Sequence, residues 1–78
     1  MSLKPLHTMG IGEISIITQF VDNARLKPRF MEMGMLPGTK VRMIKKNPFN
    51  GPIEIKIRSF YITLRCEDAN WILVDWYE

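Results

Sequence analysis

The sequence predicts one mainly β domain, residues 1–78, with one short helix and a small barrel of five strands. Three observations lead to this fold class. Short runs along most of the chain alternate apolar and polar residues, as half-buried strands do. One apolar segment with helical spacing ends at Gly34. The chain has only 78 residues, and closing a small sheet removes strand edges that so short a chain covers poorly.

The segment 29–39 holds the strongest stop signal for a helix. Gly34 follows an apolar run, at the C′ position where a residue with positive φ is needed. This places Phe30 at C3 and Met35 at C″, the pair whose apolar contact accompanies a Schellman cap. Pro37-Gly38 then forms a turn and prevents further helix. We therefore expect this glycine and the Pro-Gly turn to determine the fold here.

Alternating runs predict the strands. They cover Glu13–Phe20, Thr39–Lys46, Ile53–Arg58, Phe60–Arg65 and Trp71–Tyr77. In the third run, Ile53, Ile55 and Ile57 are expected to point inward. In the second run, Val41 and Met43 point one way and Lys40 and Arg42 the other. In the first run, Ile14, Ile16, Thr18 and Phe20 share one face, with Ile14 taken as inward. Five short strands with tight connections are typical of an SH3-like barrel.

The connections carry their own signals. Asp22-Asn23 can cap a helix that begins near Ala24, although Pro28 would then remove an early hydrogen bond, so the helix could instead begin at Pro28. Asn50-Gly51 predicts a hairpin turn. The polar stretch 66–70 predicts one helical turn. Pro5 is expected to prevent regular pairing near the N-terminus.

The net charge of +3 is unevenly distributed. Residues 24–46 carry seven Lys or Arg and one Glu, whereas residues 47–78 carry three Lys or Arg and five Asp or Glu. Such polarity can steer a partner of opposite charge. The alternative interpretation is a solvated face that keeps a small protein in solution. The pattern bears on association and not on the fold.

The composition also indicates the cellular compartment of the protein. Cys66 is the only cysteine, so no internal disulfide forms and a reducing compartment is expected. No apolar run approaches the ~18 residues of a membrane span. The N-terminal residues do not follow the pattern of a signal peptide. We therefore expect a cytoplasmic protein that does not insert into a membrane directly.

The sequence carries no signature of catalysis or of a metal site. His7 and Cys66 are isolated and lack the spacing of zinc ligands. Methionines that could bind a soft metal more often fill core gaps or contact surfaces. Glu67-Asp68 is interpreted as a helix cap. No phosphate loop and no nucleophile beside a base are found. We expect no enzyme, no cofactor and no metal ligand. The methionines considered as soft-metal ligands are Met9, Met31, Met33, Met35 and Met43.

Several apolar side chains fall on the outward register of the strands. With Ile14, Ile53 and Ile72 inward, the outward residues are Ile17, Tyr61, Trp71 and Leu73, and Phe49 stands at a hairpin tip. One interpretation is that they lie beneath the helix or the N-terminal segment. The other is a patch that contacts a partner or a second copy.

The stretch Phe30-Met31-Glu32-Met33-Gly34-Met35-Leu36-Pro37-Gly38-Thr39-Lys40-Val41 resembles the central motif of the FeoA family. The resemblance continues through Asn47–Ile53, Ile57–Phe60, Leu64-Arg65, Ala69 and Ile72–Val74. Two positions depart from the family pattern. Phe30 stands where leucine is usual, and Ser59 stands where glycine is usual, which puts the corner before Phe60 in question.

The resemblance implies a small cytoplasmic SH3-like barrel that accompanies FeoB, the bacterial ferrous-iron transporter with a cytoplasmic G domain. The chain would dock on the cytoplasmic side of that transporter and modulate transport or its GTPase. The same domain type also occurs behind DNA-binding domains in metal-dependent repressors. No helix-turn-helix region precedes it here, so the stand-alone form is expected, at the inner membrane through its partner.

Charge clustering suggests which residues meet that partner. Arg25, Arg29, Lys45 and Lys46 would guide the encounter, and Met35 and Leu36 would supply contact area. Two alternatives stay open. A small basic barrel can bind nucleic acid, although its aromatic residues are not interleaved with the lysines as stacking requires. The domain could also be a scaffold unrelated to iron, or a weak homo-oligomer.

Overall fold

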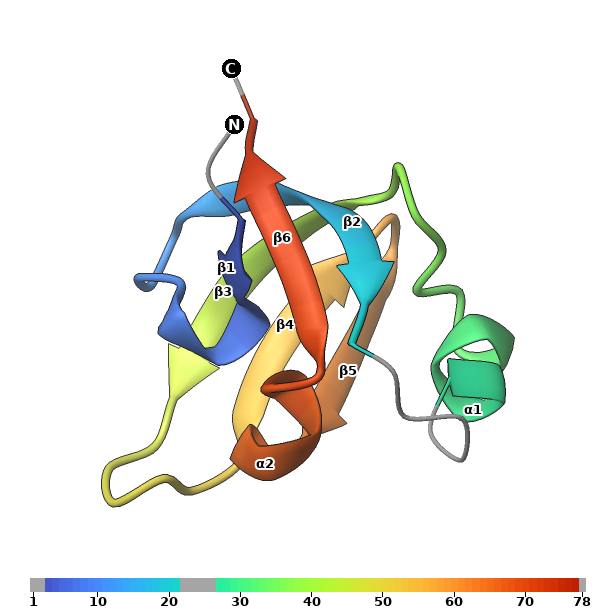
Figure 1. Ribbon diagram of the computed structural model, residues 1–78. Coiled ribbons are helices and arrows are strands. Elements are labelled where there is room, and N and C mark those ends of the chain that lie inside the picture. The colour runs from blue at the N-terminus through green and yellow to red at the C-terminus, as the bar shows by residue number, and fades with distance from the viewer. Residues whose placement is uncertain (1–2, 22–26, 78) are drawn as a thin grey trace.

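The computed structural model describes residues 3–21 and 27–77, which form one antiparallel sheet with short helices (Figure 1). The strands follow the order β1-β6-β2-β3-β4-β5. The elements in chain order are β1 (Lys4–Pro5), the 3₁₀ helix η1 (Leu6–Thr8), β2 (Ile14–Phe20), α1 (Lys27–Glu32), β3 (Lys40–Lys46), β4 (Ile53–Ile57), β5 (Phe60–Leu64), α2 (Cys66–Ala69) and β6 (Ile72–Trp76).

The five predicted strands are present as β2 to β6, each within a residue or so of its expected bounds. The helical turn predicted at 66–70 is α2. One further strand, β1, was not expected. Lys4 and Pro5 pair with Val74 and Leu73 of β6, so the prediction that Pro5 prevents pairing is wrong. Proline is tolerated there because β1 is an edge strand and needs a partner on one side only.

The core lies between the inner face of the sheet and the short helices. Ile53, Ile55 and Ile57 are buried as predicted, and Val41 and Met43 of the neighbouring strand are buried beside them. The other buried apolar residues are Leu6, Met9, Ile17, Phe30, Met35, Leu64, Ala69, Ile72 and Val74. Eight elements therefore contribute to one cluster, which suits a chain of this length.

The face of β2 differs from the prediction. Ile17, expected outward, is fully buried, and Ile14, expected inward, is 36% exposed. The run contains isoleucine on both faces, so its pattern does not decide which face is inside. The pairing of β2 with β6 also shifts between Ile17 and Gln19. This bulge adds one residue, so Phe20 turns back against the core.

The predicted outward patch is not continuous. Tyr61 is exposed, whereas Trp71 and Leu73 are half-buried. Phe49 at the β3–β4 hairpin tip is 99% exposed. These residues lie on different strands and loops, and the structure does not gather them with Ile17 into one apolar surface.

The predicted helix stop at Gly34 is confirmed atom by atom. The Met35 N–H donates to the Phe30 carbonyl at 3.0 Å, and the Gly34 N–H donates to the Met31 carbonyl at 3.0 Å. Gly34 has φ 90°. These are the two hydrogen bonds of a Schellman motif. At its other end, α1 begins at Lys27; the proposed cap at Asp22-Asn23 lies outside the described residues.

The Pro37-Gly38 turn joins α1 to β3. The Thr39 N–H donates to the Leu36 carbonyl at 3.1 Å, and Gly38 has φ 92°, which is the pattern of a type II turn. The Gly38 N–H donates to the Ile17 carbonyl at 2.7 Å. The predicted turn is therefore confirmed and is held directly against β2.

Two other corners place positive φ at residues that the sequence did not indicate, Phe49 and Arg58. In the β3–β4 hairpin, Phe49 and Asn50 both have φ 59°, so the turn is centred one residue before the predicted Asn50-Gly51 pair. At the β4–β5 corner, Arg58 has φ 56°. Ser59 is not among the positive-φ residues, so the absence of the glycine usual at that position does not disturb the corner.

None of the helices in the described ranges has the length and apolar character that crossing a membrane requires.

Candidate partner-binding groove

The residues predicted to bind a partner do not share one surface. Arg29 is exposed on α1, whereas Lys45 and Lys46 stand at the end of β3 farthest from α1 (Figure 1). Lys46 Nζ donates to the Met9 carbonyl at 3.0 Å. Met35 is fully buried, so it presents no contact area and that assignment is corrected. Grouping charges by their place in the sequence missed this separation. The seven residues of β3 extend over about 20 Å, which carries Lys45 and Lys46 away from the start of the strand. Arg25 lies outside the described residues.

Leu36, a predicted contact residue, lines a hollow. It is 38% exposed and lies at the edge of a groove of about 560 Å³. The Pro37-Gly38 turn forms one wall of this groove, and strands β2, β3 and β4 form its floor. Its apolar lining comes from Ile14, Leu36, Pro37 and Val41.

The polar lining of the groove is entirely cationic apart from Thr39. Lys40, Arg42, Lys56 and Arg58 line it, with no carboxylate among the lining residues. The sheet register brings Arg42 and Lys56 together across β3 and β4. Lys40 lies two residues before Arg42 in β3, and Arg58 lies in the turn that follows β4. Like charges directly opposite in a sheet are destabilising. This arrangement therefore destabilises the folded chain, and no residue that lines the groove carries an opposite charge.

Aromatic rings offset part of this repulsion. Lys40 Nζ lies 4.3 Å from the centroid of the Tyr77 ring, and Lys56 Nζ lies 5.5 Å from that of Tyr61. A cation over an aromatic face is stabilised by about 0.5–1 kcal/mol at exposed sites. Within residues 3–21 and 27–77, the ion pairs are Lys4–Glu13 and Arg65–Glu67. None of the four groove cations takes part in either pair.

Arg58 is the most unusual of the four. Its φ of 56° lies in the left-handed region, which costs a non-glycine residue roughly 1–2 kcal/mol. Arg58 also lines a second hollow of about 380 Å³ between the end of α1 and β5. That hollow is walled by Met33, Ile57, Phe60 and Tyr61 among others. A strained cation thus stands between the basic groove and a hollow that is lined by apolar and aromatic side chains and by Glu32.

One sequence signal could have located this groove. Lys40-Val41-Arg42 and Lys56-Ile57-Arg58 repeat the same pattern on two strands. Alternation alone places each pair outward, but only the register places the pairs beside each other.

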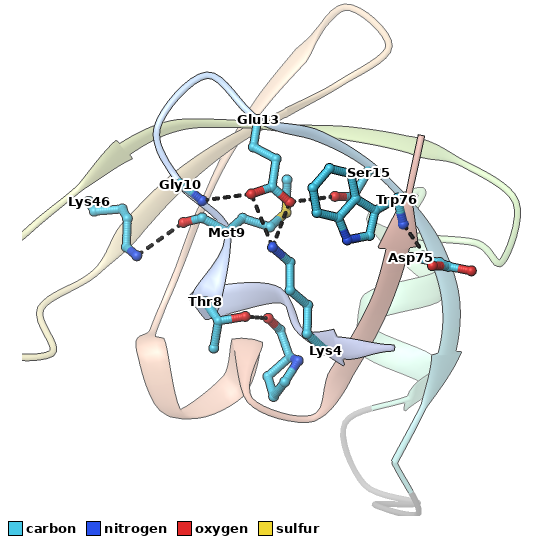
Figure 2. Close-up of polar contacts among 10 residues, drawn as sticks. Lys4, Thr8, Met9, Gly10, Glu13, Ser15, Lys46, Asp75 and Trp76 are labelled. Carbon is cyan, nitrogen blue, oxygen red and sulfur yellow. Dashed lines mark hydrogen bonds and ion pairs between the residues drawn. The ribbon is translucent and has the colours of Figure 1, made fainter. Parts of the chain in front are cut away.

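A separate polar cluster ties the N-terminal segment to β2 (Figure 2). Lys4 Nζ lies 2.8 Å and 3.0 Å from the two Glu13 carboxylate oxygens. The Ser15 hydroxyl and the Gly10 N–H also donate to this carboxylate, each at 3.0 Å. Burial raises the pKa of Glu13, but the hydrogen bonds from these three donors outweigh it and hold the pKa below its usual value. The cluster has the character of a structural anchor.

Ligand chemistry is sparse elsewhere. No group of three His, Cys, Asp or Glu residues suited to a metal ion occurs in the described part of the chain. The His7 Nδ1 atom is buried and has no hydrogen-bond partner among the residues that the structure describes. Cys66 is a free thiol, half-buried at the start of α2.

A small antiparallel sheet of this order, with a groove beside its first long turn, defines a domain of the SH3-like class. The crystal structure of Stenotrophomonas maltophilia FeoA complexed with zinc, described as a prokaryotic SH3 domain protein, aligns with a TM-score of 0.78 and 23% identity, covering 90% of this chain and 87% of that one. The FeoA domain matches residues 4–75. The chain belongs to the FeoA family.

Two further comparisons show the range of this domain. The chain is 29% identical over 75 residues to a fusion of Fe(2+) transport protein A with the Fe(2+) transporter FeoB from Porphyromonas gingivalis; the match covers 96% of the chain and 8% of the fusion protein. A manganese-dependent transcriptional repressor in complex with manganese aligns with a TM-score of 0.87 and 19% identity, covering 95% of this chain and 36% of the repressor. The FeoA family is thus associated with ferrous-iron transport, and its fold also occurs within larger regulators.

Proposed function

We propose that this chain is a non-enzymatic accessory protein of ferrous-iron uptake that docks on the cytoplasmic G-domain part of a FeoB-type transporter. The observation that carries the proposal is the fusion of the matching region to FeoB in one relative. Fusion holds two modules at high effective concentration, which is of use when the modules act on each other. By this proposal the chain works in the cytoplasm, at the inner membrane through its partner.

The groove is consistent with binding rather than catalysis. Its lining combines cations with apolar side chains and contains no nucleophile beside a base. Leu36 would supply contact area at the groove, and the exposed Arg29, Lys45 and Lys46 would contribute to long-range steering of an acidic partner. Charges at the rim act chiefly on the association rate.

Capture by the transporter tests this function. The FeoB-type transporter of the same organism would be reconstituted in nanodiscs and immobilised, and binding of the chain would be followed over time with and without GTP. We expect saturable binding that weakens with salt. In parallel, ferrous uptake would be measured in a strain lacking this chain and in the same strain complemented with it. Absence of both capture and an uptake defect would overturn the proposal.

Nucleic-acid binding is the second candidate, favoured by the four cations of the groove and by the occurrence of the fold in a repressor. Against it, a lysine ammonium occupies one face of each of the Tyr61 and Tyr77 rings, which leaves less ring surface for stacking bases. Filter binding of a single-stranded and a duplex DNA at two salt concentrations separates the candidates. Tight binding with a steep salt dependence would favour nucleic acid.

A further inference from the structure

We propose that the basic groove is the docking site for an extended, acidic segment of a protein partner, with an apolar side chain of that segment seated in the adjoining hollow beside β5. This inference rests on the proposed function for the identity of the partner, the transporter, but not for the chemistry of the segment. Four cations line the groove, and its own lining contains no carboxylate.

The spacing of the cations fits an extended chain. Lys40 and Arg42 are two residues apart on β3, Lys56 lies opposite Arg42 on β4, and Arg58 stands in the turn that directly follows β4. Residues two apart on a strand are separated by about 6.6 Å. Alternate side chains of an extended peptide laid along the groove have the same separation. A segment with acidic residues at alternate positions would therefore meet Lys40 and Arg42 in turn, with Lys56 beside Arg42.

Charge complementarity selects the acidic chemistry. Arg42 and Lys56 repel each other across the two strands, and an acidic side chain between them converts this repulsion into two attractions. Binding of the segment would thus offset the repulsion between Arg42 and Lys56 that is present in the free chain. Charged partners also steer each other before contact.

The second hollow supplies specificity. It adjoins the groove at Arg58 and is lined by Met33, Phe60 and Tyr61, with Phe60 64% and Tyr61 61% exposed. Glu32 also lines it, which favours an apolar over an acidic side chain at this end of the segment. Exposed aromatic side chains beside a charged rim are typical of contact surfaces. An apolar residue following the acidic run would bury these rings, whereas a nucleic acid has no aliphatic side chain to place there.

Peptide binding to the full chain tests the site. The probe is a fluorescein-labelled peptide of about eight residues, with glutamates at alternate positions and one leucine near its end. Controls are the same peptide with glutamines for glutamates, and a single-stranded DNA of equal charge. We expect the acidic peptide to bind, the neutral one to bind at least about tenfold more weakly, and salt to weaken the former. Tighter binding of the DNA would overturn the inference in favour of nucleic acid.

Matched variants assign the binding to the groove. Arg42→Glu is compared with Arg65→Glu, which makes the same change at an exposed position outside the groove. We expect R42E to lose peptide binding by about tenfold or more and R65E to keep it within about twofold. R42E also places a carboxylate opposite Lys56, so it should unfold at no lower a temperature than the wild type. Lost binding together with retained stability therefore cannot come from misfolding. Equal binding by both variants would overturn the site.

The same two variants, applied to transporter capture, separate this inference from the proposed function. If the transporter captures wild type and R65E but not R42E, both stand. If it captures all three equally, the chain docks by another surface and the groove is not the site. If it captures none while the acidic peptide still binds the groove, the proposed partner is wrong and the acidic-segment site stands.

Discussion

Arg42 and Lys56 lie directly opposite each other on β3 and β4, with their side chains on the outer face of the sheet and no carboxylate lining the groove between them. A protein under selection for stability alone would place opposite charges at such a pair. The arrangement is intelligible as a surface whose complement comes from another molecule. Its cost within the isolated chain can be measured directly.

Reversing one of these charges should stabilise the protein. Arg42→Glu replaces a cross-strand repulsion with an attraction and leaves the Lys56–Tyr61 contact in place, so we expect the free energy of unfolding to rise by about 0.2–1 kcal/mol. Urea titration followed by circular dichroism measures it. R65E, with its side chain 77% exposed, should stay within about 0.5 kcal/mol of wild type. The gain should shrink in high salt; a loss of stability in low salt would contradict this account of the pair.

Gly34→Ala should destabilise the helix end without any steric clash. No atom lies within 4 Å of a Cβ added at Gly34, but φ is 90°, so the cost is conformational and about 1 kcal/mol. Gly10→Ala is the matched control, since Gly10 does not have positive φ and has room for a Cβ. Thermal unfolding of both variants checks this, and equal melting temperatures would show that the Schellman cap contributes nothing.

Adjacent residues Met35 and Leu36 should behave oppositely on truncation. Met35→Ala removes a fully buried side chain and should cost about 2–5 kcal/mol, whereas Met35→Leu should cost less than about 1.5 kcal/mol. Leu36→Ala removes a side chain 38% exposed at the groove and should change stability by about 0.5 kcal/mol or less while weakening peptide binding. Urea unfolding and fluorescence anisotropy measure the two effects. A binding defect without a stability defect in Met35→Ala would contradict the assignment.

The Lys4–Glu13 cluster should make stability depend on pH in acid. The pKa of Glu13 is lowered in the folded state from its ordinary 4.5, so its ionised form favours folding above that pH. This contribution should be lost as the pH falls through the folded-state pKa. The stability difference between wild type and Glu13→Gln should therefore shrink on acidification, and Glu67→Gln, at an exposed position outside the cluster, serves as the control variant. Unfolding titrations from neutral pH downward check this; a difference that stays constant in acid would count against it.

The sequence predicted the elements that rest on local rules. Gly34 fixed a helix end because a Schellman cap involves residues within one turn of each other. Alternating isoleucines in β4 predicted its buried face because no apolar residue stood on the other face. The same rule failed in β2, where isoleucines occupy both faces and a bulge changes the register at Thr18.

The candidate site was harder to predict than the fold. Arg29, Lys45 and Lys46 were grouped because basic residues are concentrated in this part of the sequence. In the structure Lys45 and Lys46 stand at the end of β3, away from Arg29 on α1. Met35 was placed at a surface because it follows the cap, yet the cap itself turns its side chain into the core. Leu36, the next residue, was predicted to contribute contact area, and it does line the groove.

The sequence by itself determined the mainly β fold, the helix stop at Gly34, the turn at Pro37-Gly38 and the FeoA family of the chain. These depend on φ preferences and on hydrogen bonds between neighbours in sequence. Only the tertiary structure decided that Arg42 faces Lys56 and that four cations share one groove. Strand register is set by packing among residues distant in sequence, so no local pattern contains it.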